Sequence, residues 1–171
     1  MISTTWPNMS KAIPMIILTL IVIFKPAFPD FDSITEIQAK GNVIKQYNKN
    51  HETFERVLAY LLGLDGDIFI SLENKKSLRV TSFKSQDSSV IKIGDNQIEE
   101  DILSIIKELD YVYIIKIEKV IRFEKRSHVG FPQRVTYHGI AYFVSSYTPS
   151  NEDYAKLEKL NEDRYYYISV K

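Results

Sequence analysis

Hydrophobic and polar positions divide the chain into an uncharged apolar run and a longer stretch with regular apolar spacing. Residues 12–24 read AIPMIILTLIVIF and lie between Lys11 and Lys25. As a helix this run would be about 20 Å long, whereas the hydrocarbon core of a bilayer is about 30 Å thick. That length is typical of a signal-peptide core, although no A-x-A cleavage pair follows. An uncleaved signal-anchor that extends back to Trp6 is favoured, with a cleaved signal or a buried helix as alternatives.

Helical spacing of apolar residues continues after a short proline-containing break and predicts that residues 33–62 are helical. Ser33 and Glu36 have the spacing of a capping box at the start of this segment. Gly63 fits the C-cap at its end. The polar sequence NKNH at residues 48–51 favours a division into two helices.

Alternating apolar and polar residues predict strands beyond Gly63. Residues 68–72 and 78–80 would pair as a hairpin, and residues 90–93 would form a short third strand. An amphipathic helix then follows, with its apolar positions between Ile98 and Leu109. Its acidic first turn suits the positive end of the helix dipole.

The last third of the chain predicts a long hairpin followed by a helix and a strand. The first strand of the hairpin would cover residues 111–124, and its partner would cover residues 134–146. A loop at residues 126–133 would join them. Residues 148–160 would form the last helix, and residues 164–170 would form the closing strand.

This order of elements predicts a single α+β domain at residues 30–171, after a signal-anchor or signal peptide at residues 1–29. Local pairing favours a mainly antiparallel sheet of about five to six strands with helices packed on one face. Residues 1–29 hold two of the 22 basic residues and none of the 22 acidic ones, so 20 basic and 22 acidic residues remain. That near balance gives no general bias toward nucleic acid.

One segment is locally basic. Residues 116–134 carry six lysines or arginines against two glutamates, with aromatic residues nearby. Such a mixture can hold an anionic partner, although lysines on exposed strands also serve to prevent aggregation. The tyrosines near the C-terminus could add binding area or could pack in the sheet. The candidate binding surface consists of Arg122, Lys125, Arg126, His128, Arg134, His138, Tyr165 and Tyr167.

No motif predicts catalysis, a cofactor or a metal. His128 and His138 lack the spacing of a zinc site, and the chain has no cysteine. Residues 65–67 read DGD but lack the remainder of a calcium loop. The chain also has no G-x-S-x-G elbow and no glycine-rich phosphate loop. Hydrolysis would need one of the two histidines beside a carboxylate such as Glu124.

Several short motifs are shared with a loosely defined group of small bacterial proteins. They are the apolar helix at residues 54–62, DGDI at 65–68, YHGIAY at 137–142, KLEKL at 156–160 and RYYY at 164–167, with Pro149 between the third and fourth. Over residues 47–168 the chain resembles these proteins, which carry an N-terminal apolar anchor. Arg164 stands where that group would have a tryptophan. The resemblance implies an architecture and implies no functional residue.

These observations predict a non-enzymatic interaction or accessory domain that is attached to the cell membrane through residues 12–24. The domain would lie outside the cytoplasm as the C-terminal part of a single-pass protein, or would be secreted if the signal is cleaved. Its partner would be a protein or an anionic envelope component, and no nucleic acid is expected. An immunity- or inhibitor-type binding protein is the first alternative, and an envelope hydrolase is the second.

Overall fold

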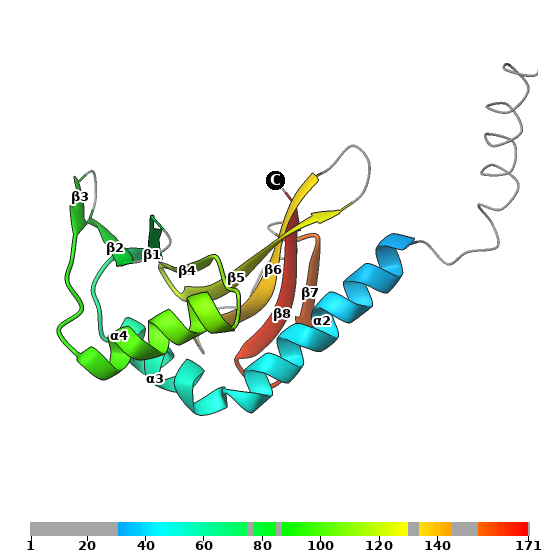
Figure 1. Cartoon of the computed structure of the whole chain (residues 1–171), viewed down its shortest axis with the longest axis horizontal. Coiled ribbons are helices and arrows are strands. Elements are labelled where there is room, and N and C mark those ends of the chain that lie inside the picture. The colour runs from blue at the N-terminus through cyan, green and yellow to red at the C-terminus, as the bar shows by residue number, and fades with distance from the viewer. Residues whose placement is uncertain (1–30, 75–76, 85–86, 130–133, 145–153, 171) are drawn as a thin grey trace, which may run out of the picture. The chain divides into compact units, whose positions relative to one another are not determined.

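The computed structural model describes residues 31–74, 77–84, 87–129, 134–144 and 154–170 (Figure 1). The predicted signal-anchor at residues 1–29, including the apolar run, lies outside these residues. Among the helices that the structure describes, none is long and apolar enough to cross a membrane. The chain divides into two compact units, Met1–Ile37 and Gln38–Lys171, and the fold below is that of the second.

The predicted helical segment forms two helices, α2 (Phe31–Lys49) and α3 (His51–Leu62), so the predicted break is confirmed. The Asn50 side chain lies at this break and donates to the Gln46 carbonyl at 2.9 Å. Because α2 begins at Phe31, Ser33 lies inside the helix and the predicted capping box is wrong. Gly63 does cap α3, with a φ of −78° rather than a left-handed conformation.

The amphipathic helix is also present, as α4 (Asn96–Leu103) followed by the π-helical turn η2 (Ser104–Glu108). Asp95 is its N-cap, because the side chain accepts from the backbone N–H groups of Gln97 and Ile98. Asp110 follows the π-helical turn with a φ of 59°, a left-handed conformation that aspartate tolerates better than most residues.

The described strands form one antiparallel sheet in the order β3-β2-β1-β4-β5-β6-β8-β7. The fold class and the mainly antiparallel sheet are therefore confirmed, but the sheet has eight strands rather than five or six. The strands are β1 (Asp67–Glu73), β2 (Ser77–Lys84), β3 (Asp87–Val90), β4 (Tyr113–Ile117), β5 (Val120–Val129), β6 (Arg134–Phe143), β7 (Lys156–Lys159) and β8 (Arg164–Val170).

The predicted single strand at residues 111–124 is wrong, because the chain reverses at Glu118 and Lys119 to form the β4–β5 hairpin. Glu118 has a φ of 49°, and its backbone N–H donates to the Asp67 carboxylate at 2.9 Å. The predicted loop at residues 126–133 is shorter than expected, since β5 continues to Val129 and residues 130–133 lie outside the described part. The third strand was predicted at residues 90–93, but it lies earlier in the chain, as β3 at Asp87–Val90.

The predicted helix at residues 148–160 is wrong over its last turn, where β7 pairs with β8. Residues 145–153 lie outside the described chain. Alternation explains the strand: Leu157 lies opposite Tyr167, while Glu158 on the other face forms an ion pair with Lys40 of α2 at 2.5 Å. Pairing with β8 provides hydrogen-bond partners for the backbone N–H and C=O groups of this short segment.

The main core lies between the sheet and the helices, which Figure 1 shows on one side of the strands. Phe54 of α3 is its centre, with ring centroids 4.9 Å from Phe123 and 5.6 Å from Tyr111. A smaller cluster occupies the opposite face of β6 and β8. It consists of Ala141, Phe143 and Tyr167, with Tyr154 packed against the last two.

Candidate functional site

A pocket of about 500 Å³ opens between α2 and the strands β5 and β6 on the helix-covered side of the sheet. Its walls combine cations with amide, carboxylate and imidazole groups. Its lining residues are Ala39, Asn42, Val43, Lys45, Gln46, Asp110, Lys125, Arg126 and His138.

The α2 wall follows from helical spacing. Ala39, Asn42, Val43 and Gln46 are separated by three or four residues, so they share one face of the helix. Val43 is fully buried and fixes the rotation of this face toward the sheet. Lys40 of α2 also forms an ion pair with Glu158 of β7, which attaches the same helix to a second part of the sheet. The hydrogen bond from Lys40 lowers the pKa of Glu158.

The strand wall is built on one register pair. Lys125 of β5 lies directly opposite His138 of β6, so both side chains project from the same face of the sheet. Gly139 permits the two backbones to approach here, because a Cβ at this position would lie 1.9 Å from the Phe123 carbonyl oxygen. A larger residue next to His138 would therefore push the two strands apart.

The Lys125 ammonium group is held inside the pocket. It lies 4.6 Å from the centroid of the Tyr111 ring and donates to the Leu109 carbonyl. Burial lowers the pKa of Lys125, and the negative charge of Asp110 partly opposes that shift. An ammonium group has three donors, so Lys125 keeps hydrogen-bonding capacity beyond the carbonyl.

His138 is a buried imidazole with a hydroxyl beside it. Its exposed fraction is 7%, and its Nδ1 lies 3.3 Å from the Ser127 Oγ. Burial lowers the pKa of His138, and the positive charge of Lys125 lowers it further. The imidazole is therefore neutral at neutral pH and acts in the pocket as a hydrogen-bonding group.

Lys45 and Arg126 make the rim of the pocket positive. Both residues are exposed, and neither forms an ion pair with any residue in the described ranges. Among the described lining residues the only carboxylate is Asp110, whereas three of the lining residues are cationic. The pocket therefore carries a surplus of positive charge.

The Gln46 carboxamide is incompletely bonded. Its Oε1 is buried and has no hydrogen-bond partner within the part of the chain that the structure describes. Buried polar atoms nearly always have a partner, so this oxygen is an unusual feature of the α2 wall.

The pocket lining includes three of the eight residues predicted for a binding surface: Lys125, Arg126 and His138. Lys125 and His138 project from one face of the sheet, whereas Arg126, which lies opposite Tyr137, leaves its strand on the other face. His128 and Arg134 belong to the neighbouring register pairs at the far end of β5 and β6, and their side chains lie outside the described part.

The other three predicted residues lie on the opposite face of the sheet. Arg122 pairs with Glu124 at 3.2 Å and lies 5.9 Å from the Tyr167 ring centroid. Tyr167 is fully buried, so it belongs to the interior and offers no surface. Burial, followed by the charge of Glu124, raises the pKa of its phenol well above the usual value. Tyr165 packs edge-on against Phe143 at 5.0 Å.

Sequence reasoning missed the α2 wall and Asp110. Ile37 of this helix is 69% exposed, whereas Val43 and Tyr47 are buried. The spacing of Val43 and Tyr47 was the available signal, because these residues continue the buried face one turn at a time. No sequence pattern indicated that Asp110 would line the pocket, because its position depends on the π-helical turn before it.

No cluster of three side chains that could hold a metal ion exists in the described ranges. A search of family models, of curated proteins and of solved structures found no match to this chain.

Proposed function

We propose that this chain is a membrane-associated accessory domain, exposed outside the cytoplasm, that binds an anionic partner through the α2–β5–β6 pocket. It has no enzymatic activity of its own in this proposal. The attachment to the membrane would come from the apolar run at residues 12–24.

The observation that carries the proposal is the surplus of cations in a concave site. Lys45, Lys125 and Arg126 come from a helix and a strand and line one hollow, whose described lining holds one carboxylate. Opposite charges attract more strongly in a partly desolvated pocket than on an open surface. An arginine at the rim adds two parallel donors that match a carboxylate or a phosphate.

A hydrolase is less well supported by this geometry. The sequence paired a histidine with Glu124, but Glu124 lies opposite Gly139 in the sheet and therefore projects from the other face than His138. Its carboxylate pairs with Arg122 there. Among the described residues no carboxylate is bonded to His138, and catalytic triads use such a group to orient the base beside the hydroxyl.

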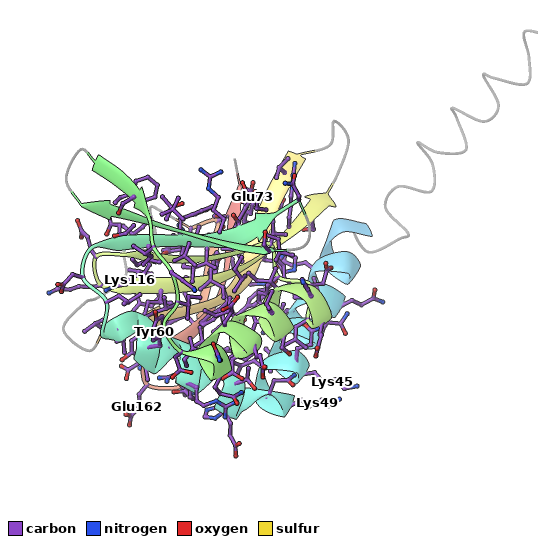
Figure 2. All side chains as sticks on the ribbon, turned by 60° about the vertical axis from the view of Figure 1, so that its left-hand side comes forward. Lys45, Lys49, Tyr60, Glu73, Lys116 and Glu162 are labelled. Atoms are coloured by element: carbon purple, nitrogen blue, oxygen red, sulfur yellow. The ribbon has the colours of Figure 1, made fainter. Side chains whose placement is uncertain are left out.

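The proposed location of the domain outside the cytoplasm is tested by cysteine labelling, which is specific because the chain has no cysteine of its own. Glu162 is exposed and labelled in Figure 2, so Glu162→Cys offers an accessible thiol. We expect a membrane-impermeant maleimide to label this variant in intact cells. Labelling only after lysis, with the same reagent, would contradict the extracytoplasmic placement.

Anion binding is tested by reversing the two rim charges. The variant K45E/R126E is compared with K49E/R79E, which makes the same charge change at exposed residues outside the pocket. Lys45 and Lys49 lie one turn apart on α2 (Figure 2). The probes are polyphosphate, polyglutamate and an acidic polysaccharide, titrated into the full chain in detergent micelles.

We expect at least one probe to bind the wild type, and K45E/R126E to weaken it by more than about tenfold. The control K49E/R79E should weaken it much less. Equal losses in both variants would show that only net charge matters, and no binding of any probe would remove the proposed function. An immunity- or inhibitor-type protein would share this surface, with polyglutamate, the peptide probe, bound most tightly.

A further inference from the structure

We infer that the pocket recognises a phosphorylated polyol, which is a molecule that joins one phosphate group to several hydroxyl groups. This inference rests on the proposed function and specifies its ligand. It follows from the way in which hydrogen-bond donors and acceptors are divided around the pocket.

The donors match a phosphate. Lys45 and Arg126 at the rim and Lys125 in the wall supply three cations around one hollow. A phosphate offers three strongly accepting terminal oxygens, and it binds arginine with two parallel hydrogen bonds. The Lys125 ammonium is already fixed by the Leu109 carbonyl and the Tyr111 ring, so it loses little freedom when an anion binds.

The acceptors require a second kind of group on the ligand. The Asp110 carboxylate lines the same pocket and repels a bare anion. A hydroxyl group donates to this carboxylate, and the exposed Asn42 amide can exchange hydrogen bonds with further hydroxyls. A ligand with both a phosphate and hydroxyls therefore suits the cations, the carboxylate and the amide of the lining.

The backbone conformation of Asp110 supports a functional role for this residue. Its left-handed φ of 59° costs more than an ordinary conformation, and its carboxylate lines the pocket near the Lys125 ammonium group. The fold forms this turn directly after the π-helical segment η2. Such segments occur frequently at functional sites.

The size of the pocket fits a small organic molecule. Its volume of about 500 Å³ lies within the range of ligand sites and exceeds what one phosphate ion needs. A hexose phosphate is of suitable size. The same chemistry occurs in a free sugar phosphate and in the phosphorylated polyol headgroup of a lipid, so the experiment must distinguish these sources.

The test uses the full chain in phosphatidylcholine nanodiscs and three soluble probes: glucose 6-phosphate, inorganic phosphate and glucose. We expect glucose 6-phosphate to bind about tenfold more tightly than phosphate, because its hydroxyls add hydrogen bonds to the Asp110 carboxylate and the Asn42 amide. Glucose alone should bind far more weakly than either, since it lacks the anionic group.

Asp110→Asn is the decisive variant. Asparagine also tolerates the left-handed conformation, so the turn should be kept. The variant should weaken glucose 6-phosphate by about tenfold, and should leave phosphate unchanged or more tightly bound because a repelling charge is gone. Glu162→Gln, which removes an exposed carboxylate outside the pocket, should change neither affinity.

The opposite results overturn the inference. If glucose 6-phosphate binds no better than phosphate, or if Asp110→Asn strengthens both, the pocket is a simple anion site and the proposed function still stands. If none of the three probes binds although a polyanion does, the inference fails alone. If the polyanions fail as well, the proposed function fails with it.

The source of the phosphate is resolved by changing the nanodisc lipid. Phosphatidylinositol in the disc should compete with soluble glucose 6-phosphate and lower its apparent affinity if a lipid headgroup is the ligand. Unchanged affinity in these discs would indicate a free sugar phosphate.

Discussion

The paired arginines, Arg56 and Arg164, and the pocket cations, Lys45, Lys125 and Arg126, have opposite electrostatic surroundings. Each paired arginine makes two hydrogen bonds to one carboxylate from another element. The three pocket cations form no ion pair among the described residues, and one carboxylate, that of Asp110, lines the same pocket. The first arrangement satisfies charge within the fold, whereas the second leaves charge available to a ligand.

The paired arginines connect the layers of the domain. Arg56 of α3 binds Asp101 of α4 with contacts of 2.7 and 2.9 Å, and this hydrogen bonding lowers the pKa of Asp101. Arg164 of β8 binds Glu55 of α3 at 2.5 and 3.2 Å. The Tyr47 hydroxyl donates to the same glutamate at 3.2 Å, so three elements meet at one carboxylate. Loss of either carboxylate partner should therefore reduce stability.

Glu55→Ala should have the largest effect. It leaves the Arg164 guanidinium, whose side chain is 16% exposed, without its carboxylate partner. We expect the free energy of unfolding to fall by about 3 kcal/mol, as for other partly buried ion pairs that lose one partner. Urea denaturation of the full chain in micelles, followed by far-UV circular dichroism, measures this change.

Glu52→Ala is the matched control, because Glu52 is exposed on the same helix. Its effect should stay within about 0.5 kcal/mol. Similar losses in the two variants would mean that the pairing with Arg164 adds nothing beyond helix propensity.

Arg56→Met should have the next largest effect on the free energy of unfolding, because Asp101 is nearly buried, although the partial exposure of Arg56 screens the pair. Since the pKa of Asp101 is lowered in the folded state, its contribution is present above the unfolded pKa and is lost as pH falls through the folded pKa.

The stability difference between wild type and Arg56→Met should therefore be largest near neutral pH and shrink below about pH 4. Urea denaturation at several pH values measures it. A difference that stays constant down to about pH 2.5 would assign the loss to packing of the arginine stem instead.

The comparison also shows where sequence reasoning reaches its limit. The division between α2 and α3 was predictable because it depends on a local polar stretch and its immediate caps. The β4–β5 turn was missed because Glu118 adopts a left-handed conformation that its residue type does not announce. The helix predicted before residue 160 was wrong, because pairing with β8 outweighed a weak helical pattern in β7.

The candidate site was predictable only where it depends on residues that are neighbours in the sequence or in one hairpin. Lys125 and Arg126 are neighbours in the basic segment, and His138 lies opposite them once β5 and β6 pair in a hairpin. Lys45 is about 80 residues earlier in the chain, and only tertiary packing brings it to the pocket. No local pattern indicated that Asp110 would oppose these cations.

His138 should give a smaller, pH-dependent effect. It faces Lys125 across the strands, and Lys45, Arg126 and Asp110 line the same pocket. Because its pKa is lowered in the folded state, the unfolded chain binds a proton first as pH falls below about 6.5. Wild-type stability should therefore decrease between about pH 8 and pH 5.5, and His138→Gln should lack this part of the decrease.

His51→Gln is the control for that measurement, since His51 is exposed on α3 and lies outside the pocket. Urea denaturation of wild type and both variants at about pH 8 and about pH 5.5 gives the change in the free energy of unfolding with pH. Equal pH dependence in wild type and His138→Gln would show that the buried imidazole does not resist protonation.

The pocket rim should have the smallest effect on stability and the clearest effect on binding. The variant K45M/R126M removes two exposed cations that have no ion pair among the described residues. We expect its free energy of unfolding to stay within about 0.5 kcal/mol of wild type, because exposed charges without partners contribute little to folding. Removing neighbouring like charges can even relieve repulsion.

The same variant should lose more than about tenfold in affinity for the anionic probe that binds the wild type. Denaturation and titration on one preparation give both quantities, and Glu55→Ala provides the reverse case with reduced stability. If K45M/R126M were destabilised as much as Arg56→Met, Lys45 and Arg126 would be structural. The contrast between paired arginines and pocket cations would then disappear, because surplus charge is available to a ligand only where the fold does not depend on it.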